Sequence, residues 1–233
     1  MGNYQYIGDE LELFSHAKNW KAYFAELIRP YVRGRVLEVG AGIGETTRAL
    51  ASQDATSWTC LEPDPLLAER LQSLTLPGGK SPKVVIGTIE DLASRPAFDA
   101  VLYIDVLEHI TDDARELLAA RNRLVTGGHL IVLSPAFQFL FSDFDRAIGH
   151  HRRYTRRTLT SIIPPGLEPI RVCYADSAGM LLSLANKLLL RRSLPTVQQI
   201  LFWDRRIIPV ARRVDRLLNH SIGRSVVGVF RRR

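Results

Sequence analysis

The hydrophobic and polar positions of the chain follow two successive patterns. Over residues 11–27 apolar side chains recur every three or four positions, as on a helix with one buried face, and Pro30 closes the segment. From residue 35 onward, short apolar runs alternate with helical stretches. The predicted strands are 35–39, 57–61, 83–86, 98–104 and 129–134, and the predicted helices are 45–51, 65–74 and 112–125. This alternation is typical of a doubly wound parallel sheet.

The pattern changes after Pro135. A loop rich in aromatic residues precedes a predicted helix at 155–163, a strand at 168–175 and a last strand at 225–230. The interval between these two strands is too long for a hairpin loop, so we expect it to contain helices. The predicted class is therefore α/β: a Rossmann-like doubly wound sheet, mostly parallel with an antiparallel last strand, plus an N-terminal helix and a C-terminal helical insertion.

The length of 233 residues suits one domain, 1–233, with two appended elements. We expect residues 1–30 to form a helical lid, and residues 176–220 to form a helical cap over the carboxyl edge of the sheet, inserted before the last strand. Residues 180–190 are almost continuously apolar but shorter than the ~20 residues of a membrane-spanning helix. No signal peptide and no zinc-like cysteine spacing are evident, which favours a cytoplasmic location.

Charge divides the chain near residue 145. Residues 146–233 hold 18 Lys and Arg against 4 Asp and Glu, a net charge of +14, whereas residues 1–145 are net −7. A basic half of this kind indicates an anionic partner, which could be a phosphorylated substrate, a membrane surface or nucleic acid. The simpler alternative is a solvated basic face.

The strongest motif is the segment 36–44, a hydrophobic strand that runs into three glycines and then a helix. Glycines permit the turn and allow a ligand to approach the backbone closely. The third glycine is Gly44 and position 45 is Glu45, so the usual dinucleotide spacing is not met. Glu38 adds a carboxylate that repels pyrophosphate but suits the cationic amino group of a methionine tail.

Three further motifs at strand ends follow the glycine turn. Glu62 ends the second strand about 20 residues later, where an acid accepts hydrogen bonds from ribose hydroxyls. Residues 87–92 follow the third strand, where an adenine edge would lie. Residues 98–110 form a strand that ends in polar groups at the carboxyl edge of the sheet, which is where ligands bind in open α/β sheets.

Together these motifs, over residues 35–135, resemble the class I S-adenosylmethionine-dependent methyltransferases, in the branch with Leu-Glu-His-Ile after strand four. The resemblance implies S-adenosylmethionine as cofactor. Many relatives have Asp where this chain has Thr88, which leaves backbone groups or Glu90 as alternative adenine contacts. The implied cofactor residues are Glu38, Gly40, Ala41, Gly42 and Gly44 at the methionine part, Glu62 and Pro63 at the ribose, Thr88, Ile89 and Glu90 at the adenine, and Asp105 near the sulfonium.

Residues 142–155 follow the fifth strand and resemble a Gly-His-x-Arg-Arg-Tyr-Thr segment found in one methyltransferase subgroup. On this basis the predicted acceptor-binding residues are Arg152, Arg153 and Tyr154, together with Trp20 of the N-terminal helix. The alternative is a structural loop, in which the arginines pair with Asp143 and Asp145 and Thr155 caps the next helix.

Methyl transfer from an activated cofactor requires alignment of the acceptor and exclusion of water. A base helps when the acceptor is a hydroxyl, an amine or an activated carbon, and a neutral histidine is suited to this near pH 7. His109 is the first candidate, followed by His150 and His151. Asp105, Glu108 and His109 could bind a cation, but the resemblance accounts for the first two, so no metal is expected.

We therefore expect an S-adenosylmethionine-dependent methyltransferase, of the EC 2.1.1 class, acting on a small or amphipathic acceptor of natural-product, isoprenoid or lipid-like type that could be anionic. The alternatives are a silent module that binds the cofactor or a membrane, and a nicotinamide-dependent oxidoreductase. Nucleic acid is a disfavoured partner because no RNA-binding module or base-methylating motif is present. Peripheral membrane contact and a homodimer are further alternatives for the basic and apolar faces.

Overall fold

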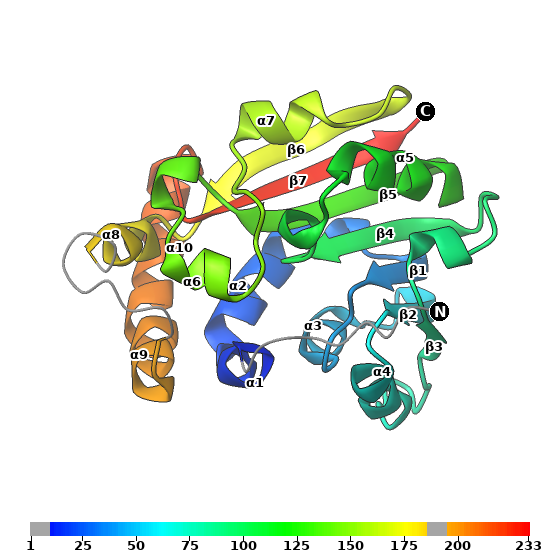
Figure 1. Ribbon diagram of the computed structural model, residues 1–233, viewed down its shortest axis with the longest axis horizontal. Coiled ribbons are helices and arrows are strands. Elements are labelled where there is room, and N and C mark those ends of the chain that lie inside the picture. The colour runs from blue at the N-terminus through cyan, green and yellow to red at the C-terminus, as the bar shows by residue number, and fades with distance from the viewer. Residues whose placement is uncertain (1–9, 186–194) are drawn as a thin grey trace.

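A seven-stranded sheet runs through the molecule in the order β3-β2-β1-β4-β5-β7-β6 (Figure 1). The computed structural model describes residues 10–185 and 195–233. Among these residues β7 alone runs antiparallel, pairing with β5 on one side and β6 on the other. This confirms the predicted Rossmann-like sheet with a reversed last strand. The strands are β1 (Gly34–Val39), β2 (Ala55–Glu62), β3 (Lys83–Ile86), β4 (Phe98–Ile104), β5 (Leu124–Pro135), β6 (Leu167–Ala175) and β7 (Ser225–Arg232).

Helices cover both faces of the sheet, so each strand buries side chains on two sides. Along β1, Val36 belongs to the core that includes α2, and Leu37 belongs to the core that includes α5 and α7. This alternation follows from the two-residue period of a strand. The crossover and flanking helices are α3 (Glu45–Leu50), α4 (Pro65–Gln72), α5 (Asp113–Arg123), α6 (Asp143–Ala147) and α7 (Arg156–Ser161), with short 3-10 turns at η1 (Arg29–Tyr31), η2 (Ile89–Asp91), η3 (Leu107–His109) and η4 (Gln138–Leu140).

The N-terminal segment forms two helices, α1 (Glu10–Ser15) and α2 (Lys18–Ile28), where the apolar spacing predicts one. Ala17, between them, offers no side-chain cap to α2. Asp204, a buried residue far along the chain, accepts the backbone N–H groups of Asn19 and Trp20 at 3.1 and 2.9 Å. The helix break therefore depends on a tertiary cap, which the local pattern does not contain.

The C-terminal interval contains α8 (Ser177–Ala185), α9 (Val197–Phe202), the π-helical turn η6 (Trp203–Ile207) and α10 (Ile208–Leu217). Pro209 lies in the first turn of α10, directly after the π-helical turn. These helices lie beside α1 and α2 at the carboxyl edge of the sheet (Figure 1). Residues 1–9 of the predicted lid and 186–194 of the predicted cap lie outside the described residues. In the part of the chain that is described, no helix is both long and apolar enough to span a membrane.

Candidate active site

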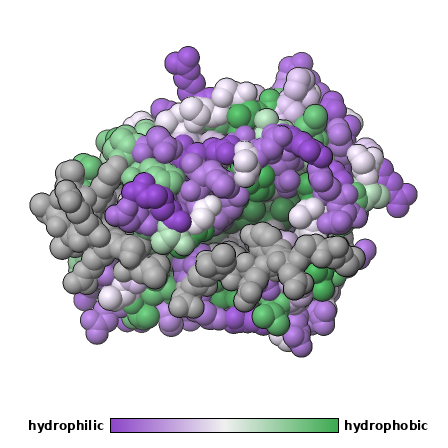
Figure 2. All heavy atoms as spheres, viewed as in Figure 1, coloured by the Kyte–Doolittle hydropathy of each residue, from purple (hydrophilic) through white to green (hydrophobic). Residues whose placement is uncertain are grey.

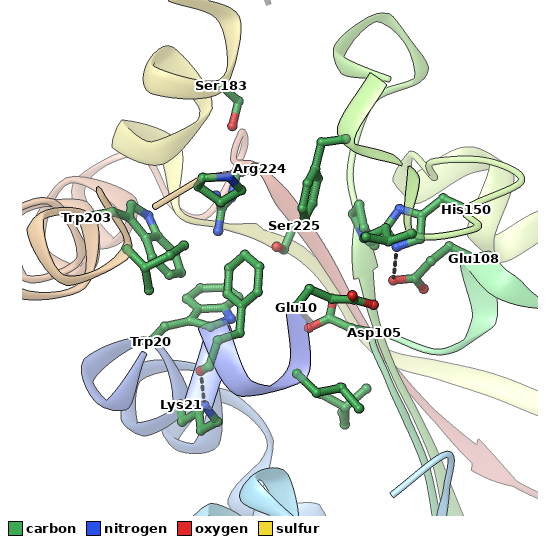
Figure 3. A pocket seen from close by; sticks show the side chains of 18 of the residues that line it. Glu10, Trp20, Lys21, Asp105, Glu108, His150, Ser183, Trp203, Arg224 and Ser225 are labelled. Atoms are coloured by element: carbon green, nitrogen blue, oxygen red, sulfur yellow. Dashed lines mark hydrogen bonds and ion pairs between the residues drawn. The ribbon is translucent and has the colours of Figure 1, made fainter. Parts of the chain in front are cut away.

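A cavity of about 840 Å³ opens at the carboxyl ends of β1 and β4, where the strand order reverses (Figure 3). This switch point is the usual ligand position in doubly wound sheets. The wall combines the glycine turn, polar groups that follow β4, and apolar side chains from both ends of the chain. The lining includes Phe14, Trp20, Lys21, Gly40, Ala41, Gly42, Asp105, Glu108, His109, Leu140, Phe144, His150, Arg153, Phe202, Trp203 and Arg224.

The glycine turn exposes backbone to this cavity. Gly40, Gly42 and Gly44 all have positive φ, at 65°, 56° and 80°. A Cβ added to Gly42 would point toward Leu11 of α1, 3.5 Å from its methyl groups, and so would occupy cavity space. A Cβ on Gly44 would instead lie 2.4 Å from Leu74, so this glycine permits close packing of the turn against the chain after α4. The turn thus forms an open cradle that fits the methionine end of the predicted cofactor.

Glu62 ends β2 beside the turn and is 4% exposed. Its carboxylate accepts the Gly42 N–H at 2.8 Å and the Asp64 N–H at 3.0 Å. Burial raises the pKa of Glu62, and the two backbone hydrogen bonds oppose that rise. Each carboxylate oxygen keeps a second lone pair for a ligand hydroxyl. Glu62 lies outside the cavity lining, next to it along the same edge.

The predicted adenine residues follow β3 at that edge. Thr88 precedes the 3-10 turn η2 and donates both its N–H and its hydroxyl to Asp91, at 2.7 and 3.1 Å. Ile89 is fully buried, while Glu90 is exposed and pairs with Arg115 at 2.7 Å. Asp91 thus engages the polar groups of Thr88. Adenine binding by these residues stays a prediction.

Glu38 lies behind the glycine turn. Its carboxylate accepts hydrogen bonds from the Thr47 hydroxyl at 2.6 Å and the Trp58 indole N–H at 2.8 Å. Burial raises the pKa of Glu38 to about 7. Glu38 is 2% exposed and is absent from the cavity lining, so the structure places it as a support of the turn. Its predicted pairing with the cofactor's amino group stays a prediction.

Charged groups gather on the cavity wall around Asp105 (Figure 3). Asp105 follows β4 in a left-handed conformation, with φ of 54°. The surrounding protein raises the pKa of its carboxyl to about 6, against the opposing effects of His150, Arg224 and Lys21. Burial lowers the pKa of the Lys21 ammonium. The site therefore holds both signs of charge, as a zwitterionic ligand tail requires.

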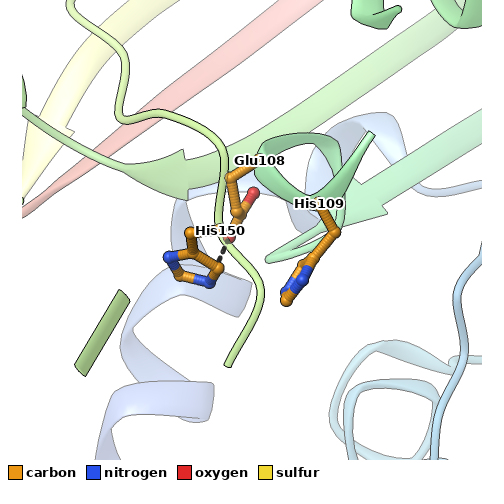
Figure 4. Close-up of side chains that lie close together, drawn as sticks. All are labelled: Glu108, His109 and His150. Carbon is orange, nitrogen blue, oxygen red and sulfur yellow. Dashed lines mark ion pairs between the residues drawn. The ribbon is translucent and has the colours of Figure 1, made fainter. Parts of the chain in front are cut away.

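A second polar group is formed by Glu108, His109 and His150 (Figure 4). The two imidazole rings meet edge to face at 4.6 Å, and His150 Nε2 lies 3.8 Å from Glu108 Oε1. His150 Nδ1 is 2.9 Å from Asp145, which also receives two hydrogen bonds from Arg153, at 2.8 and 2.9 Å. Burial lowers the pKa of His109 to about 4, so its ring is neutral at pH 7.

The structure brings only some of the predicted acceptor and base residues to the cavity. Trp20 and Arg153 line the cavity, but the Arg153 guanidinium already forms a salt bridge with Asp145. Arg152 pairs with Asp113 at 2.7 Å outside the lining, and the buried Tyr154 hydroxyl bonds to the same carboxylate at 2.7 Å. His151 is exposed and lies 3.1 Å from the Thr111 hydroxyl. The Arg153–Asp145 pair agrees with the structural alternative for the loop, whereas Arg152 pairs with Asp113 and not with Asp143. Acceptor binding by the arginines stays a prediction.

Lys21 and Arg224 are cavity residues that sequence reasoning does not identify. Lys21 lies on α2, and Arg224 immediately precedes β7, more than 200 residues later. Arg224 lies 4.2 Å over the Trp203 ring and 3.2 Å from Asp176. Neither residue belongs to a motif. Only the fold brings them beside Asp105.

Comparison with known proteins supports the same assignment. Residues 37–130 match the family model described as "Methyltransferase domain". "Ubiquinone biosynthesis O-methyltransferase" of Xylella fastidiosa strain 9a5c is 39% identical over 106 residues, covering 44% of this chain and 42% of the relative. The protein of that name from Xanthomonas axonopodis pv. citri is 32% identical over 100 residues, covering 42% and 41%. The chain thus spans about two fifths of the length of these curated relatives.

Solved structures share the whole fold. A putative methyltransferase in complex with the Haloferax volcanii Trm112 activator has a TM-score of 0.65 at 15% identity, covering 96% of this chain and 94% of that one. A possible histamine N-methyltransferase from Thermotoga maritima has a TM-score of 0.62 at 19% identity, with coverage of 97% and 95%. NodS from Bradyrhizobium japonicum, solved with S-adenosylhomocysteine, has a TM-score of 0.57 at 15% identity, with coverage of 92% and 85%.

The family match and the fold agree on one class of domain. Residues 37–130 match a methyltransferase domain, and the chain has a fold that solved methyltransferases also have. The cofactor of this domain is S-adenosylmethionine, as the resemblance of residues 35–135 implies.

Proposed function

We propose that the chain transfers the methyl group of S-adenosylmethionine to a hydroxyl oxygen of an amphipathic acceptor with an aromatic or isoprenoid body. One observation carries this proposal. A single cavity connects the glycine turn, the Glu108–His109–His150 group and an apolar wall. A cofactor on the turn and an acceptor against the wall would therefore meet beside the two histidines.

The apolar wall is assembled mainly from aromatic side chains. The ring centroid of Phe14, on α1, lies 6.2 Å from that of Phe144 and 6.3 Å from that of Trp203. The ring centroids of Trp20 and Trp203 are 5.9 Å apart. Such a surface favours a ring or a hydrocarbon chain over a strongly hydrated substrate. Because α1, α2 and the C-terminal helices supply it, we assign the segments 10–28 and 195–218 to the acceptor pocket.

The reaction requires little chemistry from the protein. The cofactor, when bound, supplies a methyl group already activated as a sulfonium. In the transfer the oxygen–carbon bond forms, the sulfur–carbon bond breaks, and S-adenosylhomocysteine, a methyl ether and one proton result. The chain positions the acceptor oxygen, excludes water, and receives that proton at the histidine group. His150, held by Asp145, is better oriented for this role than His109.

The choice of oxygen as the methyl acceptor rests on two supports. The curated relatives carry names that specify O-methyl transfer in ubiquinone biosynthesis. In addition, a neutral imidazole beside the cavity suits the removal of a proton from an acidic hydroxyl such as a phenol. An aromatic hydroxyl on an isoprenoid body would match both the histidine group and the apolar wall.

Turnover with paired acceptors tests the proposal. The full chain is incubated with labelled S-adenosylmethionine and either a catechol or the same catechol carrying a short polyprenyl chain. We expect methyl ether formation with both, and a KM at least tenfold lower for the prenylated compound because its tail buries apolar area. Binding of S-adenosylhomocysteine without turnover of any hydroxyl acceptor would instead favour a silent cofactor-binding module.

A matched pair of variants locates the acceptor. Phe144→Ala removes a ring from the cavity wall, whereas Phe139→Ala removes a ring that is 56% exposed and absent from the lining. We expect Phe144→Ala to raise the KM of the prenylated acceptor several-fold and to leave S-adenosylhomocysteine affinity unchanged. Equal KM values for the two variants would place the acceptor elsewhere.

A lipid-like acceptor also makes peripheral membrane contact a reasonable expectation. Arg205, Arg206 and Arg213 lie on η6 and α10, near the exposed apolar residues Val210 and Leu217. Figure 2 shows hydrophilic side chains over most of the visible face and smaller hydrophobic patches, one of them over α9. Sedimentation with anionic and neutral vesicles tests this contact. Homodimer formation likewise stays a prediction.

A further inference from the structure

Glu108 is a buried carboxylate with little hydrogen bonding. It is 0% exposed, and neither carboxylate oxygen accepts a well-formed hydrogen bond among the described residues, with the Ser134 hydroxyl in weak contact beside it. The nearest cationic candidate, His150 Nε2, is 3.8 Å away, which is too long for a hydrogen bond. A buried carboxylate in this state is costly unless a cation or a proton compensates it.

The contacts of His150 define what faces Glu108. Asp145 accepts a hydrogen bond from His150 Nδ1 at 2.9 Å, and Arg153 and the Ser142 N–H hold that carboxylate in place. Because Nδ1 is taken up by Asp145, Nε2 is the ring nitrogen that is turned toward Glu108. Two atoms that can both ligate a metal ion, His150 Nε2 and Glu108 Oε1, therefore lie 3.8 Å apart. His109 adds a third donor, because all three ligand atoms lie within 4.8 Å of one another.

We propose that Glu108, His109 and His150 bind one divalent transition-metal ion, of the Zn²⁺ or Co²⁺ type, at the wall of the cavity. Imidazole nitrogens select such ions over Mg²⁺ and Ca²⁺. Bonds of about 2.1 Å place two ligands of a tetrahedral ion about 3.4 Å apart, so the 3.8 Å gap closes by a small side-chain rotation. The ion would sit between the carboxylate and the two rings (Figure 4).

The site resembles a catalytic metal site in its layout. Three protein ligands leave a coordination position open, and all three residues line the cavity, so that position faces the acceptor. Asp145 supplies the carboxylate that orients a metal-binding histidine through its second nitrogen. The exposed ring of His151 is directed to Thr111 instead.

This inference rests on the proposed function and sharpens it. An acceptor oxygen at the open position would lose its proton more readily, because a divalent ion stabilises the resulting anion. His109 and His150 would then act as ligands, and the proton would pass to solvent. A substrate with an acidic hydroxyl, such as a phenol or a catechol, fits this arrangement best, because the oxygen that the ion helps to ionise is the one that receives the methyl group.

Metal titration of the full chain tests the site without reference to turnover. The protein is dialysed against a chelator and titrated with Co²⁺, whose visible absorption reports tetrahedral nitrogen ligation, and Zn²⁺ is then used to displace it. We expect one ion per chain. Glu108→Gln and His150→Ala should each weaken the affinity at least 100-fold, and Asp145→Asn should weaken it about 10- to 100-fold. His16→Gln, which removes an exposed imidazole from another part of the chain, should leave it unchanged.

Absence of Co²⁺ absorption, or equal affinity in wild type and Glu108→Gln, would overturn the metal site. If these variants do not fold, X-ray absorption of the zinc-loaded wild-type chain decides the question. Scattering from two imidazoles supports the proposal, and an oxygen-only shell overturns it. Methylation that proceeds in the metal-free chain would leave methyl transfer standing and remove the ion's role. Ion binding without methylation of any hydroxyl would support the metal site and contradict the proposed methyl transfer.

Discussion

The two halves of the cavity are built in different ways. The half that we assign to the cofactor, here called the cofactor half, is formed by the glycine turn after β1, and an acid at the end of β2 supports that turn, all within residues 36–64. The half that we assign to the acceptor, here called the acceptor half, joins α1 and α2 to segments about 180 residues later. In the first half, backbone conformation and short sequence spacing create the site. In the second, contacts between distant segments create it.

Three buried aspartates hold the acceptor half together. Asp204 caps α2, Asp176 accepts the Trp203 indole N–H at 2.9 Å, and Asp215 accepts the Tyr23 hydroxyl at 2.6 Å. Asp215 also accepts the backbone N–H groups of residues 176 and 177, at 2.7 and 3.0 Å. Buried carboxylates with several donors fix geometry, and each depends on partners that are remote in sequence. We therefore expect the loss of one polar group to lower the stability of the chain more in the acceptor half than in the cofactor half.

The largest expected effect is at Asp215. Asp215→Ala leaves three buried donors unpaired, so we expect the free energy of unfolding to fall by about 3–5 kcal/mol. Urea unfolding followed by circular dichroism measures it. Asp143→Ala, which removes an exposed ion pair with Arg146, should cost no more than about 0.5 kcal/mol. Similar losses of unfolding free energy in both variants would contradict the expected difference between buried and exposed acids.

The raised pKa of Glu38, in the cofactor half, predicts that the free energy of unfolding depends on pH. Its pKa is about 7 in the folded chain because of burial, against an ordinary value of 4.5. The folded state therefore binds this proton more tightly than the unfolded state, and its contribution to stability is lost as the pH rises from about 4.5 through 7. We expect the difference in unfolding free energy between Glu38→Gln and wild type to shift in favour of the variant by about 2–3 kcal/mol between pH 4.5 and pH 8. A difference independent of pH would contradict this.

Gly42 tests whether the turn is the cofactor cradle. Gly42→Val adds a branched side chain at φ of 56° and directs it into the cavity. We expect the affinity for S-adenosylhomocysteine, measured by calorimetry, to fall about 100-fold or more. Gly78→Ala is the matched control, because its φ is 81° and its added Cβ meets no atom within 4 Å. Unchanged affinity in a folded Gly42→Val protein would remove the cofactor from this turn.

Glu62 predicts the smallest effect. Glu62→Ala deletes the acceptor of two backbone hydrogen bonds and of the expected ribose hydroxyls, so cofactor affinity should fall by about 1–3 kcal/mol. Competition with adenosine separates the two contributions, because loss of a ribose contact weakens adenosine as well. If only S-adenosylhomocysteine weakens, Glu62 acts by holding the glycine turn.

The sequence by itself predicts the sheet, its reversed last strand and the cofactor turn. Periodic burial, glycine spacing and an acid 20 residues on are local signals, and each is read over a few residues. It also places His109 and His150 among the candidates, because both follow strands at the carboxyl edge. The spacing also puts Glu108 next to His109, but it does not bring His150 to them, since 41 positions separate the two rings in the chain.

Only the tertiary structure decides the rest. Asp204 caps α2 and so separates it from α1. Asp145 pairs with the Arg153 guanidinium. Lys21 and Arg224 supply the positive charges near Asp105. A buried polar group takes whichever partner the fold supplies, and that partner can lie anywhere in the sequence. The cofactor half was therefore determined locally by backbone geometry, whereas the acceptor half was decided by long-range pairing of buried charge.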